Sequence, residues 1–207
     1  MFELIEEVDE VQLAISLPGL ESVPTGKFIP FDRLVVDALQ DAYFDALFIG
    51  GFSKDYGEET SRELSRICAE KRIELVVFEN PANDLAVIQD VVLNIADKLF
   101  SNEQPNNLGI ADIRNLNLYS DHLYAFNRKQ SALDFLQTLG LVNVVGGVFL
   151  AHENTSLSEY EATGDELLSY FTEEGFLCSS IHSSGRGECT ILLGIEKQKV
   201  YCAEDRE

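Results

Sequence analysis

Short apolar runs alternate with amphipathic segments along this chain, and this alternation constrains the fold more than any other feature of the sequence. Residues 46–49 form an apolar run that ends at Gly50 and Gly51, and residues 58–71 follow with apolar side chains at helical spacing. Residues 73–78 form a second continuous apolar run, as expected of a parallel strand buried on both faces. This order predicts a right-handed βαβ unit and therefore an α/β fold.

The remainder of the chain continues the alternation. Apolar spacing predicts further helices at residues 31–44, 84–96, 129–139 and 164–174. Strand-like runs are predicted at residues 98–101, 110–118, 148–151, 177–182 and 189–196. The turn at residues 183–187 predicts that the last two runs pair as an antiparallel hairpin. We therefore expect a Rossmann-like three-layer sandwich at residues 31–207, with a mostly parallel sheet and a C-terminal antiparallel hairpin, preceded by an N-terminal extension at residues 1–30.

The charge balance limits the partners that the chain can have. It carries 36 acidic and 15 basic side chains, which gives a formal net charge of −21. A field of that sign repels phosphate backbones and anionic membrane surfaces, so neither nucleic acid nor membrane is expected as a partner. The acidic surface serves solubility on the simplest interpretation, while a cationic ligand or a basic protein partner stays open.

The cysteines and the N-terminus indicate the compartment. The four cysteines are scattered without a Cys-x-x-Cys pair, so neither a zinc site nor a disulfide framework is expected. The N-terminal residues are acidic where a secretory signal is basic, and no apolar stretch approaches the length of a membrane span. We expect a cytoplasmic protein, and the sequence leaves its oligomeric state open.

Several segments of the second half follow the pattern of one enzyme family. The segment Ala111-Asp112-Ile113-Arg114 is similar to a strand with an Asp-Ile pair in the class I S-adenosylmethionine-dependent methyltransferases. Val145-Gly146-Gly147-Val148 resembles the family's Pro-Gly-Gly turn before a strand, and Glu173-Glu174-Gly175-Phe176 with the following runs resembles its ending. The resemblance implies a Rossmann-like fold and S-adenosylmethionine as the cofactor.

The cofactor-binding residues follow from the same resemblance. The stretch from Leu47 to Ser53 is similar to the first cofactor motif of the family, so Gly50 and Gly51 are expected at the cofactor, although glycines also serve ordinary turns. Glu79 matches the carboxylate that binds the ribose hydroxyls, with a solvated or capping carboxylate as the alternative. Asn80 and Asn117 complete the expected cofactor-binding set.

The resemblance implies methyl transfer to a small-molecule or protein acceptor. His152 follows a predicted strand and is the candidate general base, with a surface histidine as the alternative. His122 and Tyr119 are candidates for the substrate side of the crevice. Phe48 and Phe52 stand where the family has an acidic residue and a second glycine, which favours the alternative of a catalytically inactive, methyltransferase-like binding or scaffold protein.

Overall fold

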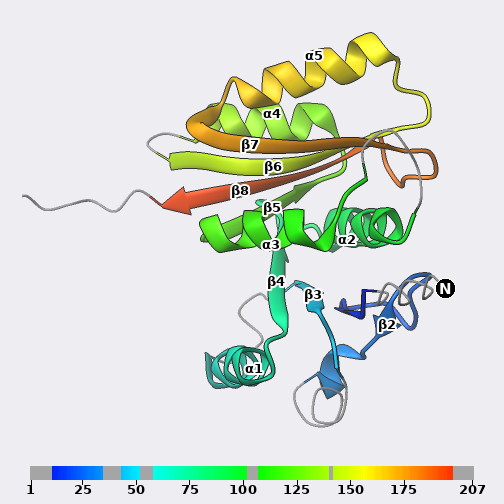
Figure 1. Cartoon of the computed structure of the whole chain (residues 1–207), viewed down its shortest axis with the longest axis vertical. Coiled ribbons are helices and arrows are strands. Elements are labelled where there is room, and N and C mark those ends of the chain that lie inside the picture. Colours follow the sequence, from blue (N-terminus) through cyan, green and yellow to red (C-terminus); the bar gives the residue numbers. More distant parts are fainter. Residues whose placement is uncertain (1–10, 35–42, 52–57, 102–106, 140–141, 198–207) are drawn as a thin grey trace, which may run out of the picture.

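A single eight-stranded sheet organises the chain, with the strand order β2-β1-β3-β4-β5-β8-β6-β7 (Figure 1). The structure is a computed structural model and describes residues 11–34, 43–51, 58–101, 107–139 and 142–197. The strands are β1 (Leu13–Ser16), β2 (Lys27–Phe28), β3 (Ala46–Gly50), β4 (Glu74–Glu79), β5 (His122–Phe126), β6 (Val142–His152), β7 (Phe171–His182) and β8 (Cys189–Lys197). All neighbouring strands pair in parallel except β8, which is antiparallel to both β5 and β6.

Helices cover both faces of the sheet, as side chains that alternate along the strands show. Phe48 and Val148 face the core formed with α2 (Leu85–Leu99) and α3 (Ile110–Tyr119). Leu47 faces the opposite side, toward α1 (Glu58–Lys71), and Phe149 faces α4 (Lys129–Thr138) and α5 (Leu157–Leu168) on that same side. A short 3-10 turn, η1 (Phe31–Arg33), precedes the residues that lead to β3. The chain is therefore an α/β three-layer sandwich, as predicted.

Several elements lie where the sequence placed them. The predicted helix at residues 58–71 is α1, and the one at residues 129–139 is α4 with one residue fewer. The apolar runs at residues 46–49 and 73–78 are β3 and β4, which pair in parallel, whereas most of the helix predicted at residues 31–44 lies outside the described residues.

Two of the predicted strands are not strands in the structure. Residues 110–118 belong to α3, because Ile113 and Leu116 bury one side of a helix and the Asp112 carboxylate accepts a hydrogen bond from the Gly109 amide at its start. Residues 98–101 were predicted as a strand, but α2 continues to Leu99. The helix predicted at residues 164–174 starts and ends earlier, because Ser156 caps α5 and the chain has already entered β7 at Phe171.

The antiparallel strand near the C-terminus is present, but its partner differs from the prediction. The strand β8 pairs with β5 and β6, so β6 lies between β7 and β8. The turn between β7 and β8 therefore spans a neighbouring strand instead of joining paired strands.

The described part of the predicted N-terminal extension belongs to the sheet. The strand β1 is buried at every position and pairs with β3, and β2 pairs with β1 at the sheet edge. A boundary at residue 30 therefore does not separate this segment from the core.

Candidate functional site

The glycine turn after β3 is packed by side chains of the protein itself. A Cβ atom on Gly50 would lie 2.3 Å from Cγ2 of Ile88 and 2.9 Å from Cδ2 of Leu17. Gly51 has a φ of +70°, and a Cβ there would lie 2.6 Å from Cδ2 of Leu85. Side chains of α2 and of the residues after β1 therefore lie directly against these two glycines.

Phe48 also fills the core at this point. Its side chain is fully buried, and its ring meets the ring of Phe78 edge to face with the centroids 5.2 Å apart. Phe52 lies outside the described residues. At the end of β3, therefore, the described residues do not fit an adenosyl group.

Glu79 lies on the other face of the sheet from the packing at Gly50. Gly50 is paired with Phe78, whose side chain joins the core of α2 and α3, so the next residue, Glu79, points to the opposite face. There the two carboxylate oxygens of Glu79 lie 3.1 and 3.2 Å from Nδ1 of His122, whose ring stacks on Tyr124. Burial and the neighbouring Glu79 raise the pKa of Tyr124. The turn and the carboxylate thus do not enclose one hollow.

Asn80 holds the turn after β4 together. Its Nδ2 donates to the carbonyl of Ala125 at 2.9 Å, and its Oδ1 accepts from the amides of Ala82 at 3.0 Å and Asp84 at 3.2 Å. Asp84 in turn caps α2. The polar atoms of Asn80 therefore serve the fold.

Asn117 lies away from the other expected cofactor residues. It belongs to α3, and its Nδ2 donates to the carbonyl of Leu75 at 3.1 Å and to the carboxylate of Glu74. Both partners are at the start of β4, whereas Glu79 and Asn80 are at its end. The sequence predicts that Asn117 joins Glu79 and Asn80 in one set, but α3 places it at the opposite end of β4 from both.

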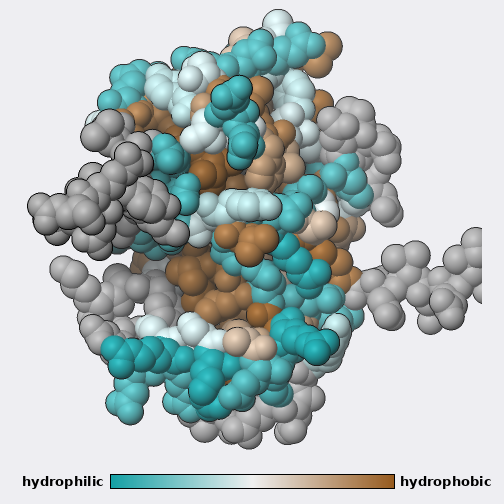
Figure 2. All heavy atoms as spheres, turned by 60° about the vertical axis from the view of Figure 1, so that its left-hand side comes forward, coloured by the Kyte–Doolittle hydropathy of each residue, from teal (hydrophilic) through white to brown (hydrophobic). Residues whose placement is uncertain are grey.

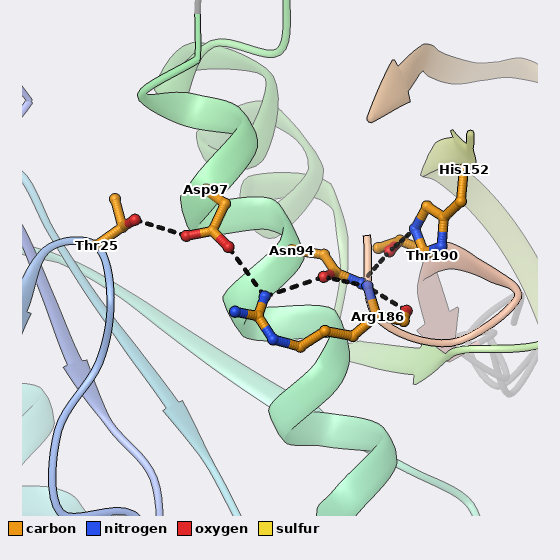
Figure 3. A network of polar contacts seen from close by, with 6 residues as sticks. All are labelled: Thr25, Asn94, Asp97, His152, Arg186 and Thr190. Carbon is orange, nitrogen blue, oxygen red and sulfur yellow. Dashed lines mark hydrogen bonds and ion pairs between the residues drawn. The ribbon is translucent and has the colours of Figure 1, made fainter. Parts of the chain in front are cut away.

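His152 is built into a polar network at the end of β6 (Figure 3). Its Nδ1 lies 3.1 Å from the carbonyl of Gly187, which only accepts, so Nδ1 carries the hydrogen. Its Nε2 lies 3.1 Å from the hydroxyl of Thr190 and accepts from it. Burial lowers the pKa of His152, although the Gly187 carbonyl opposes this effect. Both nitrogens of the neutral ring are engaged inside the protein.

Asn94 is the centre of this network. Its Nδ2 donates to Thr190 Oγ1 at 2.8 Å and to the carbonyl of Arg186 at 2.9 Å, and its Oδ1 accepts from the amide and the guanidinium of Arg186. The guanidinium of Arg186 also pairs with Asp97 at 2.9 Å, and Asp97 accepts from the hydroxyl of Thr25 (Figure 3). The network fastens the turn between β7 and β8 to α2 and to the loop before β2.

The sequence offered one signal for this network that the prediction did not use. Asn94 interrupts the buried apolar side of α2 in the stretch Val-Val-Leu-Asn-Ile-Ala, and its side chain is fully buried. A buried amide requires hydrogen-bond partners. The identity of those partners, more than 90 positions further along the chain, is not visible in that stretch.

His122 and Tyr119, the candidates for the substrate side, lie in different surroundings. His122 starts β5 and contacts Glu79, whereas Tyr119 ends α3 and is 61% exposed.

Burial raises the pKa of the cysteine thiols in the described part of the chain. The pKa is about 11 for Cys68 and Cys178 and about 12 for Cys189, so these thiols are poor nucleophiles. Within the described ranges, no group of three or more His, Cys, Asp or Glu side chains could hold a metal ion.

A large open groove lies on another side of the molecule. In Figure 1 the starts of β6 and β7, the end of β8 and the end of α3 lie together on the left, and Figure 2 turns this side forward. The groove has a volume of about 830 Å³ and is lined by residues of all four elements and by Asp121 before β5. Figure 2 shows apolar surface in the middle of this side, bordered by hydrophilic side chains.

Comparisons with known proteins give a distant structural similarity and no family. No protein-family model and no curated protein matches the chain. Among solved structures, the W319Y mutant of FtsZ from M. jannaschii is similar with a TM-score of 0.43 and 10% sequence identity, over 73% of this chain and 55% of that chain. The chain thus spans about half the length of that neighbour, and a similarity at this level carries no information on function. Of the helices in the described ranges, none combines the length and the apolar character needed to cross a membrane.

Proposed function

We propose that this chain is a binding or scaffold module that does not transfer methyl groups. The observation that carries the proposal is the packing at Gly50, where Ile88 and Leu17 lie directly against the glycine that the resemblance assigns to the cofactor. The glycines that resemble a cofactor motif have a different physical reason, since they let α2 and the residues after β1 approach the end of β3 closely.

The other expected site residues support the same proposal. Asn80 and His152 direct their polar atoms to partners within the fold, and Glu79 and Gly50 point to opposite faces of the sheet. In His152, Nδ1 is hydrogen-bonded to the carbonyl of Gly187 and Nε2 to the hydroxyl of Thr190, so the ring fastens two main-chain segments together. What is left for interaction is the outer surface.

Titration with S-adenosylhomocysteine tests the proposal. We expect no heat in calorimetry and no shift of the thermal midpoint at ligand concentrations of about 1 mM, because a ligand that does not bind the folded state leaves its stability unchanged. A midpoint that rises with ligand, and that no longer rises in a Glu79→Ala variant, would contradict the proposal and support methyl transfer instead.

A further inference from the structure

The wall of the groove is formed by an irregularity in β7. Val144 of β6 is paired with Phe171 and Gly146 with Phe176, so the residues between Phe171 and Phe176 face a single residue of β6. Glu173 and Glu174 lie in this bulge and are exposed at the groove. Bulges of this kind turn side chains away from the regular alternation of a strand, and they direct these two carboxylates to the rim.

The floor of the groove offers apolar surface. Leu118 and Tyr119 end α3 and are 73% and 61% exposed, and Phe176 of β7 also lines the groove. Two adjacent large apolar side chains at a concave surface are typical of a contact with another molecule, because covering them removes apolar area from water. An aromatic ring at such a place also accepts a cation on its face.

The charge of the groove selects the partner. Asp121, Glu173, Glu174 and Glu196 line it, and the described lining residues include no lysine or arginine. The groove also contains the C-terminal end of α3, which carries the negative end of the helix dipole. With a net charge of −21 on the chain, the groove repels acidic ligands and attracts basic ones.

We propose that this groove binds a basic, extended segment of a partner protein, in which Lys or Arg residues alternate with aliphatic residues. Lys and Arg cover apolar surface with their stems while their charged ends reach carboxylates, so one segment satisfies both Leu118 and the acidic rim. The proposal rests on the proposed function as a binding module and names the chemistry of its partner. A second copy of this chain is disfavoured as the partner, because two chains that each carry a net charge of −21 repel each other.

The test uses fluorescence anisotropy at about 0.15 M salt with the full chain and a labelled peptide of three Arg-Leu-Lys-Ser repeats. The double variant Glu173→Lys, Glu174→Lys is compared with the control Glu59→Lys, Glu63→Lys, which makes the same change in net charge on exposed positions of α1. We expect the groove variant to weaken binding by about tenfold or more and the control by about twofold, because screening at this salt concentration confines the charge effect to about 8 Å. Equal weakening by both variants would overturn the proposal and indicate attraction to the acidic surface in general.

A second pair of variants tests the apolar contribution. Leu118→Ser is compared with Leu157→Ser, which removes a leucine that is 67% exposed on α5. We expect Leu118→Ser to weaken peptide binding by about fivefold, also at high salt, and Leu157→Ser to leave it unchanged. Equal affinities for the two variants would overturn the proposal, since charge alone would then account for binding.

The peptide-binding experiment and the S-adenosylhomocysteine titration can fail independently of each other. Specific peptide binding together with binding of S-adenosylhomocysteine would refute the non-catalytic function and leave the groove proposal standing. Absence of both, with thermal midpoints showing that all variants fold, would refute the groove proposal alone.

Discussion

Substitution of Gly50 by alanine separates a packing glycine from a cofactor glycine. The added Cβ would lie 2.3 Å from Cγ2 of Ile88, a separation that real Cβ contacts do not show, so either the Ile88 side chain or the main chain of β3 must shift. Overpacking of a core costs about 1–3 kcal/mol, and the gain of about 0.5–1 kcal/mol from replacing glycine in a strand offsets only part of it. We expect Gly50→Ala to lower the free energy of unfolding by about 1–2 kcal/mol.

A second substitution identifies the atom responsible. Ile88→Ala removes Cγ2 and, as a truncation of a buried isoleucine, costs about 2–5 kcal/mol alone. In the Ile88→Ala background the alanine at position 50 enters the vacated space, so its cost falls to zero or becomes a gain. The double variant is therefore more stable than the sum of the single changes predicts, by about 1 kcal/mol or more.

Urea unfolding at 25 °C measures all four proteins of this cycle by linear extrapolation. Gly164→Ala in α5 is the matched control, since its Cβ would lie 3.8 Å from Leu177 and make an ordinary contact. We expect this control to raise stability by about 0.5–1 kcal/mol through helix propensity. Additive effects of Gly50→Ala and Ile88→Ala would refute the packing explanation and return Gly50 to the cofactor interpretation.

Two further predictions concern the polar network. Asn94→Ala leaves Thr190 and the main chain of Arg186 without their partner, so unfolding measured by urea should show a loss of about 2–4 kcal/mol, and a loss below about 1 kcal/mol would contradict the central role of this amide. Because burial lowers the pKa of His152 in the folded chain, its stabilising effect is present above the unfolded value of about 6.5 and is lost as the pH falls below it. A comparison of urea midpoints between pH 7.5 and 5.5 should therefore show a steeper loss for the wild type than for His152→Gln, and parallel curves would exclude this explanation.

The local pattern of apolar residues was enough to predict a helix or strand that buries one face or both faces. The apolar run at residues 73–78 and the helical spacing at residues 58–71 and 129–139 specify their elements without reference to the rest of the chain. The same reasoning gave the wrong element for the segment of α3, because its apolar residues repeat at both helical and strand spacing. Ile113 and Leu116 are three positions apart on the buried side, whereas Leu116 and Leu118 are two apart and imitate a strand.

The local pattern of residues could not predict which distant segments pair as neighbouring strands. The position of β8 between β5 and β6, and the bulge that places Glu173 and Glu174 on the rim of the groove, depend on which strands become neighbours. The turn at residues 183–187 looks locally like that of a hairpin, because a turn reverses the chain in the same way whether or not a third strand enters between its arms.

The glycines at the end of β3 show why a cofactor motif is ambiguous on one sequence. Gly50 and Gly51 indicate that something approaches the main chain more closely than a side chain permits, and a phosphate, an adenosyl group or an isoleucine all meet that condition. The approaching group here is Ile88, on a helix that begins 35 residues after Gly50. Phe78 is paired with Gly50 and faces α2, so Glu79, the next residue of β4, points to the opposite face of the sheet. Gly50 and Glu79, which the sequence suggested as two sides of one site, therefore belong to two different layers of the molecule.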